Sequence, residues 1–268
     1  MSALEPLRLY GRYFATSIRS QLQYRASVVM LTIGHLLMTG VEFFGMWALF
    51  DRFGHLQQWR LAEVALLYGM ANIAFAISEA VGRGFKAFGQ MVRKGDFDRL
   101  LLRPRGTAFQ VCAQHFELVR LGRLLQGLAV LGYAIVELGL LDAGSRLLLL
   151  LTAIIGGACV FTGLFILQAT TAFWTVESLE IFATVTYGGV ETTQYPMSIY
   201  RDGFRSVFTF VVPLVFVNYV PGLAILGRPQ TIGPWWLAWI SPLIGLAFLL
   251  LCLRLWRLGV RHYRSTGS

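Results

Sequence analysis

Long apolar runs alternate with short polar segments along this chain. Five of these runs cover residues 26–50, 61–82, 124–141, 147–173 and 235–256. A helix needs about 20 residues, each rising roughly 1.5 Å, to cross the hydrocarbon core of a bilayer. Each run meets or approaches that length. The pattern therefore predicts an all-α protein that crosses a membrane several times.

Two further segments compete for one more crossing. Segment 178–196 is weakly apolar, whereas segment 206–226 is strongly apolar but interrupted by Pro213 and Pro221. Hydropathy and charge both favour a crossing at 206–226. A proline removes a backbone donor, which is tolerated at membrane depth only where protein or water covers the freed groups. The residues by themselves therefore give only a mild preference for 206–226.

Basic residues gather on one side of the predicted spans. Most of the 23 Lys and Arg residues lie in the first 25 residues, in the 83–123 connection and in the tail after residue 253. The positive-inside rule places all three segments in the cytoplasm. Both ends of the chain are then cytoplasmic, which requires an even number of crossings. Six spans is the number that fits.

Composition supports a membrane protein built as a single domain over residues 1–268. The chain is 56% hydrophobic and 14% charged, whereas soluble domains carry about 25% charged residues. The net charge of +9 does not indicate nucleic-acid binding, because the basic residues fall between apolar runs. The three cysteines lie far apart and form no CxxC pair, so no metal site is predicted.

The N-terminal segment is expected to form an interfacial helix. Apolar residues recur on one helical face and arginines on another, as is typical of a helix lying in the headgroup region. Its role is either a lever that transmits movement to the first span or a simple anchor. The apolar face consists of Leu7, Tyr10, Phe14, Ile18 and Leu22.

Several ionisable residues fall inside the predicted spans. Glu63 and Glu137 lie near span ends and are expected to be solvated, whereas His35, Glu42 and Glu79 lie deeper. A buried carboxylate in a membrane is costly and usually faces a partner or a pathway. His35 and Glu42 are seven residues apart and share a helical face. They are predicted to line a substrate path, to pair with another subunit or to form a structural hydrogen bond.

The 83–123 connection contains apolar residues at helical spacing, among them Phe88 and Met91, followed by Gly95. The spacing predicts a short amphipathic helix that ends before this glycine. Such a helix would either fill a groove on another protein or lie on anionic headgroups.

Three stretches together resemble a bacterial subfamily of ABC-2 type permeases. They are YPMSIYRDGFRSVFTFVVPLVFVNYVPGLAILGR at 195–228, GDFDRLLLRPRG at 95–106 and RHYRSTGS at 261–268. One departure is Arg201, where the subfamily usually has proline. The residues that match the longest pattern are Tyr195, Pro196, Ile199, Tyr200, Thr209, Phe210, Pro213, Phe216, Tyr219, Pro221, Leu226 and Gly227.

The resemblance implies a polytopic fold with six transmembrane helices, an N-terminal interfacial helix and a re-entrant helical pair before the last span. Segment 178–196 then becomes the fifth span, and residues 203–226 enter the outer leaflet and turn back. This reverses the preference given by hydropathy. The implied turn contains Asn218 and Tyr219, flanked by Pro213 and Pro221, and faces a partner or the mouth of a pathway.

The resemblance also implies a function. The chain would be the permease subunit of an ABC exporter in the bacterial cytoplasmic (inner) membrane. It contains no G-x-x-x-x-G-K-[ST] motif, so ATP and Mg would be bound by a separate ATP-binding subunit, present in two copies. A second permease subunit, similar or identical, would complete the transporter. Phe88, Met91, Asp98 and Arg103 would form the contact through which ATP hydrolysis is coupled to transport.

Two other functions remain open. A proton-coupled secondary transporter would use Glu42, Glu79 and His35 as proton carriers, although such proteins usually show internal repeats and none is found in this sequence. A membrane scaffold without transport activity is the other. The sequence gives no indication of a substrate.

Overall fold

The structure is a computed structural model that describes residues 5–56, 58–114, 117–175 and 179–264. Within these ranges the regular elements are helices, and the single β-bridge joins Leu56 to Trp59. The all-α prediction is therefore confirmed.

Among the residues that the structure describes, five helices are long and apolar enough to cross a membrane, and they overlap the five predicted runs. The 3-10 turn η1 (Leu118–Arg120) leads directly into the third of them. The five are α2 (Arg25–Phe53), α3 (Leu61–Arg93), α6 (Leu121–Glu137), α7 (Gly144–Thr171) and α11 (Leu237–His262). A shorter helix, α8 (Leu179–Thr193), falls on the weakly apolar segment and packs against α7 and α3.

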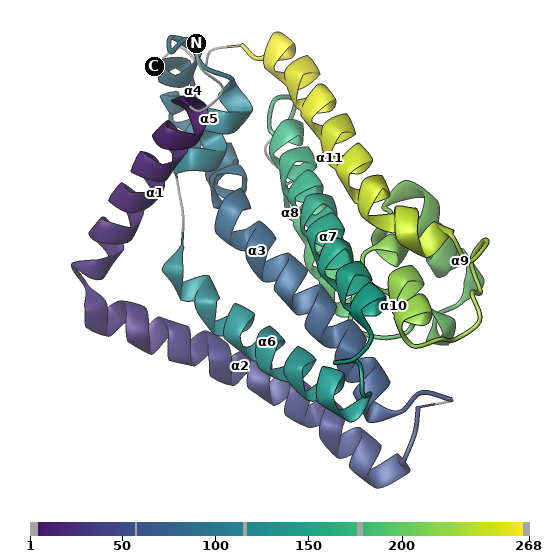
Figure 1. The fold of residues 1–268 in the computed structure, drawn as a ribbon. Helices are drawn as coiled ribbons and strands as arrows, with labels where there is room; N and C mark the ends of the chain where they lie inside the picture. The colour runs from purple at the N-terminus through teal and green to yellow at the C-terminus, as the bar shows by residue number, and fades with distance from the viewer. Residues whose placement is uncertain (1–4, 57, 115–116, 176–178, 265–268) are drawn as a thin grey trace.

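Helix α1 (Glu5–Leu22) occupies the segment predicted to be an interfacial helix. Figure 1 shows it as an arm that leaves the end of the bundle near α4 and α5 and meets α2 at a sharp elbow. The elbow consists of a two-residue turn, Gln23 and Tyr24. Tyr24 is 74% exposed.

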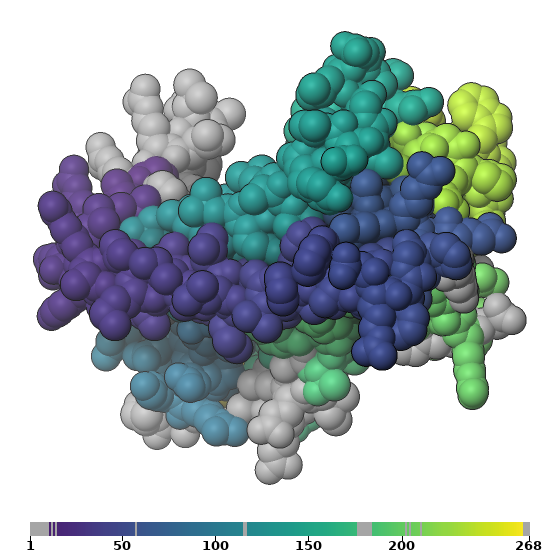
Figure 2. Space-filling view, turned by 90° about the horizontal axis from the view of Figure 1, so that it is seen from below, coloured from purple at the N-terminus to yellow at the C-terminus, as the bar shows by residue number. Residues whose placement is uncertain are grey.

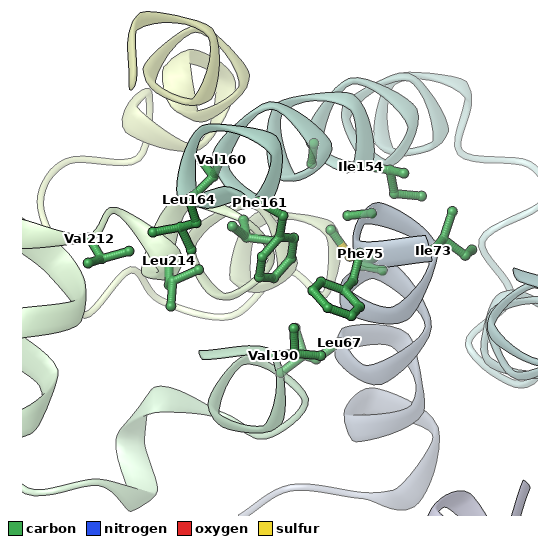
Figure 3. Close-up of a cluster of buried hydrophobic side chains, with 14 of the residues drawn as sticks. Leu67, Ile73, Phe75, Ile154, Val160, Phe161, Leu164, Val190, Val212 and Leu214 are labelled. Carbon is green, nitrogen blue, oxygen red and sulfur yellow. The ribbon is translucent and has the colours of Figure 1, made fainter. Parts of the chain in front are cut away.

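Helix α3 forms the centre of the molecule. It packs against α6 on one side and α7 on the other, and α7 in turn packs along α11 (Figure 1). Phe75 of α3 meets Phe161 of α7 edge to face, with ring centroids 5.2 Å apart (Figure 3). Because α3 is apolar on most of its circumference and is covered by several neighbours, it is buried along most of its length.

The predicted separate helix after the span 61–82 is wrong, because α3 continues without a break to Arg93. Gly82 and Gly84 do not end the helix. Their missing side chains let neighbouring segments approach α3 closely, since a Cβ atom at Gly82 would lie 2.8 Å from Phe165 and one at Gly84 would overlap the carbonyl of Val111. The predicted stop at Gly95 is confirmed, because this residue adopts a left-handed backbone with φ 72°.

The crossing of α7 and α11 depends on small residues. A side chain at Gly156 would lie 2.6 Å from the Cα atom of Pro242, and one at Gly245 would overlap the carbonyl oxygen of Gly156. The two backbones therefore touch directly, as small residues permit in membrane helices.

The two short helices at the end of the bundle where α3 finishes are α4 (Asp96–Leu101) and α5 (Thr107–Gln114). At the opposite end lies a series of short turns that joins α8 to α11. These are η2 (Met197–Ile199), α9 (Asp202–Ser206), the π-helical turn η3 (Val207–Val211), η4 (Leu214–Phe216) and α10 (Tyr219–Ile225).

This series of turns, residues 197–228, begins and ends at the same end of the bundle (Figure 1). Its middle reaches inward between the helices. Leu214 fills the space beside Gly189, and Val217 fills the space beside Gly157, near the middle of α7. Val212 and Leu214 lie beside Leu164 of α7 in the core (Figure 3).

Helix α2 is the least covered of the long helices. Its buried side chains are Thr39, Met46 and Phe50. Figure 2 shows α2 running across the face seen from below, with α6 alongside it. Most of its apolar surface is therefore left for lipid or for another protein.

Candidate functional site

Phe88 was expected to contact a partner, but it lies in the core. Its ring centroid is 5.0 Å from that of Phe97, 5.1 Å from that of Phe173 and 4.8 Å from that of Trp256. The side chain is fully buried. The prediction of an exposed Phe88 is wrong, because the face of α3 that bears it is covered by α4, α11 and the end of α7. We call these four rings, together with Phe85 and Tyr263, the aromatic cluster.

A groove of about 470 Å³ lies beside the aromatic cluster, between the last turns of α3 and α4. Met91 forms part of its floor, and Arg103 lies on its rim. The structure therefore brings these two predicted contact residues together. We call this the docking groove, and its lining residues are Ala87, Gln90, Met91, Lys94, Asp96, Arg99, Leu100, Arg103 and Gln114.

Asp98, the fourth predicted contact residue, does not line the docking groove. It is half-buried and lies close to the hydroxyl of Tyr263, just after the end of α11. Burial, reinforced by the Asp98 carboxylate, raises the pKa of Tyr263 to about 12. Asp98 therefore belongs to the contact between α4 and the end of α11.

Glu79 lies within an ion network that the sequence did not reveal. One carboxylate oxygen is 3.4 Å from Lys86 Nζ and 3.3 Å from the Tyr187 hydroxyl, and the other is 3.4 Å from Arg120 Nη1. Lys86 also donates a hydrogen bond to Tyr187. We call these four residues the Glu79 cluster. It connects α3, η1 and α8, and its carboxylate is 2% exposed.

The sequence placed Lys86 and Arg120 in a cytoplasmic connection, so they were not considered as partners for Glu79. Because α3 continues past Gly84, Lys86 comes to lie two turns beyond Glu79 on the same face. The seven-residue spacing between them was the available signal. A carboxylate held between two cations is a structural ion network rather than an isolated charge.

His35 and Glu42 have different surroundings although they lie on one helix. His35 is half-buried and lines a cavity between α1, α2 and α3. Glu42 is exposed, and its carboxylate is 3.5 Å from the Tyr68 hydroxyl. That hydroxyl accepts a hydrogen bond from the Gln126 amide at 3.1 Å. No hydrogen bond or ion pair connects His35 to Glu42 within the described ranges.

The predicted turn residues in 197–228 are buried within the chain. The Asn218 amide donates to the backbone carbonyls of Leu67, at 3.2 Å, and Thr193. The Tyr219 hydroxyl is 3.1 Å from the Thr231 hydroxyl. The prediction that Asn218 and Tyr219 face a partner or the mouth of a pathway is therefore wrong for this structure, since both side chains are covered by neighbouring segments of the same chain.

The two prolines of this segment are also buried. Pro221 lies in the first turn of α10, where the backbone N–H it lacks would have no partner inside the helix. Pro213 directly precedes η4 and so separates it from the π-helical turn η3.

Arg228 fastens the end of this segment to the start of α3. Its guanidinium lies 2.9 Å and 2.8 Å from the two carboxylate oxygens of Glu63 and 4.4 Å from the ring of Trp59. The Trp59 indole donates to the Ser198 hydroxyl at 3.2 Å. We call these four residues the Arg228 anchor. The expectation that Glu63 is solvated is wrong, because its carboxylate is paired, whereas Glu137 is exposed as predicted.

Comparison with known families adds to this geometry. The family model described as ABC-2 family transporter protein matches residues 36–267. The chain belongs to the ABC-2 transporter family. This confirms the resemblance carried by the three sequence stretches. Comparison with curated proteins and with solved structures finds no match.

As a member of the ABC-2 family, the chain is a multi-pass membrane protein and the membrane component of an ABC transporter. Such a component works with an ATP-binding subunit, and this sequence itself has no phosphate-binding G-x-x-x-x-G-K-[ST] motif. No group of three or more His, Cys, Asp or Glu side chains is placed to hold a metal ion in the part of the chain that the structure describes.

Proposed function

We propose that this chain is the permease subunit of an ABC exporter and moves its substrate outward across a bacterial inner membrane. A separate ATP-binding subunit, present in two copies, binds and hydrolyses ATP with Mg. The observation that supports this most strongly is the family match over 36–267. The docking groove gives the ATP-binding subunit a place to bind, at the end of the bundle rich in basic residues.

The docking groove is suited to a protein partner with mixed charge. Its rim carries Lys94, Arg99 and Arg103, together with Asp96. Met91 and Leu100 provide an apolar floor. An apolar floor inside a charged rim is the usual anatomy of a protein interface.

In the proposed topology, six helices span the membrane, with α8 as the fifth span, and both termini are cytoplasmic. Residues 203–226 form a re-entrant pair on the outer side. Two observations support this arrangement. The Arg228 anchor joins the end of the segment to residues 59–63, and Figure 1 places the α6–α7 connection at that same end of the bundle.

Cysteine labelling tests the topology. Gly203 and Ser206 are both exposed, and each is replaced by cysteine in a chain without its own three cysteines. An impermeant maleimide added outside intact cells is expected to label both positions and a cysteine at Asp142. A cysteine at Arg103 should remain unlabelled until the cells are opened. Labelling at Arg103 together with protection at Gly203 would contradict the proposal.

A second permease subunit is the expected partner within the membrane. Glu42 is exposed near the middle of α2, and Glu191 is exposed on α8. A carboxylate facing hydrocarbon is costly, so such a residue usually faces protein or a water-filled cavity. A second permease that covers α2 would shield Glu42 from lipid.

The function itself is tested by purifying the full chain together with its ATP-binding subunit and measuring ATP hydrolysis in nanodiscs. Arg103→Glu is expected to reduce both co-purification and hydrolysis, because it reverses a charge on the rim of the groove. Arg261→Glu is the control, since Arg261 is exposed in the last turn of α11 and does not line the groove. Uptake driven by a pH gradient without any ATP-binding subunit would favour a secondary transporter. If neither ATP hydrolysis nor pH-driven uptake is observed, the result would favour a membrane scaffold.

A further inference from the structure

A cavity of about 690 Å³ lies beneath the elbow between α1 and α2. Its walls come from α1, the first turns of α2, the later part of α3 and the segment Glu117–Arg120. It exceeds the docking groove in volume and shares only Ala87 with it. The proposed coupling to an ATP-binding subunit therefore does not account for this cavity.

One wall of the cavity is cationic. Arg83 Nε lies 2.7 Å from a Glu117 carboxylate oxygen, while the Arg83 side chain remains 33% exposed. A guanidinium has five N–H donors. Because the Arg83 side chain lines the cavity and keeps a third of its surface exposed, its guanidinium can be reached by a ligand there.

The charges around this wall do not cancel. Arg120 also lines the cavity and is paired with Glu117 and with Glu79. With Lys86 and Glu79, which do not themselves line the cavity, the connected network holds three cations, Arg83, Arg120 and Lys86, against two carboxylates. The wall therefore has an excess of positive charge and attracts an anion.

The α2 wall of the cavity combines apolar Val28 and Leu31 with polar Ser27 and His35. Val28 and Leu31 both line the cavity, yet Leu31 is also 53% exposed. The exposed surface continues along α2 through Ile33 and Leu37. The apolar lining of the cavity therefore continues into the exposed face of α2.

The elbow lies at the level expected of lipid headgroups. Tyr24 lines the cavity, and Arg25 begins the long apolar run of α2. Tyr and Arg at the end of an apolar helix are typical of the interface between hydrocarbon and water. A ligand that enters here meets charge at one end and hydrocarbon at the other.

We propose that this cavity binds the anionic headgroup of a membrane phospholipid, with Arg83 in direct contact with the headgroup and the acyl chains along α2. A soluble anion would satisfy the arginine but leave the wall of Val28 and Leu31 without a partner. This inference goes beyond the proposed function. It requires only that α2 lies in a bilayer and holds whether or not the chain exports anything.

Native mass spectrometry of the full chain in mild detergent tests the inference. Phosphatidylglycerol and phosphatidylcholine with identical acyl chains are added separately, and the lipid retained on the protein is counted. We expect one phosphatidylglycerol to be retained at a lower concentration than phosphatidylcholine. Arg83→Gln should raise the phosphatidylglycerol concentration for half occupancy about tenfold, the effect of losing one charge-assisted hydrogen bond. Arg83→Lys should restore part of the loss.

Two further variants keep the result interpretable. Arg93→Gln removes an exposed arginine from the same helix, outside the cavity, and should leave retention unchanged. Ala87→Trp fills part of the cavity without removing a charge and should also weaken phosphatidylglycerol retention. Equal retention of the two lipids, or an equal loss in Arg93→Gln, would overturn the proposal. Displacement of phosphatidylglycerol by equimolar inorganic phosphate would show a soluble-anion site instead.

Discussion

Arg228 and Glu63 form a two-point ion pair across 165 residues of sequence, with nitrogen–oxygen distances of 2.9 Å and 2.8 Å. The pair connects the start of α3 to the end of the 197–228 segment. Because both charges are largely shielded from solvent and the geometry is bidentate, the pair is stronger than an ordinary surface ion pair.

Removing this pair should loosen the 197–228 segment. Arg228→Gln and Glu63→Gln are each expected to lower the thermal unfolding temperature of the full chain in detergent. A double-mutant cycle should give a coupling free energy of roughly 1–2 kcal/mol, reduced from the buried limit because the side chains remain partly exposed. Arg201→Gln, an exposed arginine in the same segment, should change little. Additive effects of the two variants would rule out a direct interaction.

Phe88→Asp is expected to prevent folding rather than to uncouple the transporter selectively. Truncating a buried phenylalanine costs about 3–5 kcal/mol, and a buried carboxylate adds to that cost. The measurement is the yield of monodisperse protein together with its thermal unfolding. The matched control is Leu102→Asp, since Leu102 lies near the same end of the bundle but is 87% exposed. A stable Phe88→Asp protein would contradict the buried position of this ring.

Glu79→Gln should destabilise the chain strongly, because it leaves Lys86 and Arg120 without their common carboxylate. Removing one partner from a buried ion network lowers the free energy of unfolding by about 3–5 kcal/mol. The double variant Glu79→Gln/Lys86→Gln should recover part of the loss, since it also removes one of the uncompensated cations. Thermal unfolding in detergent measures both effects. Glu137→Gln, at an exposed helix end, is the control and should behave like the unmodified chain.

If a second permease covers α2, cysteines on its exposed face should be cross-linked to that subunit. Met38→Cys and Val41→Cys place the thiol at positions that are 72% and 71% exposed. A bifunctional maleimide applied to membranes should yield a product of about twice the mass of the chain. Met46→Cys, whose parent residue is 3% exposed, is expected to give none. Absence of the product at every exposed position on α2 would argue that lipid covers this helix.

The long helices could be predicted because each depends on a local property. The apolar runs at 26–50 and 147–173 have the length of a bilayer, and α2 and α7 are found there. Gly95 ended α3 as expected because its backbone conformation favours glycine. These features require no knowledge of what packs against them.

The continuation of α3 was not predictable in the same way. The apolar run ends at residue 82 and the basic connection begins at Arg83, which favoured a span that stops there and a separate helix after it. In the structure Gly82 and Gly84 are the positions where Phe165 and the Val111 carbonyl approach the helix. Tertiary packing therefore supports one continuous helix, and the same packing covers Phe88.

The residues of the candidate site were the hardest to place. The helical spacing of Phe88 and Met91 correctly indicated an apolar face, but spacing does not say which neighbour covers it. Asn218 was expected to face a partner or the mouth of a pathway because the family resemblance implies a re-entrant turn at this residue. Its partners are instead the backbone carbonyls of Leu67 and Thr193, which only the folded chain brings together.

Helix α3 has Glu63 in its first turn and Met91 in its last. Its 33 residues form a rod of about 50 Å with no proline to bend it. A partner that displaced the Met91 end of this rod would displace the Glu63 end with it, and the Arg228 anchor joins that end to the 197–228 segment. Movement at one end of the bundle would then reach the segment at the other end without any change of conformation within α3.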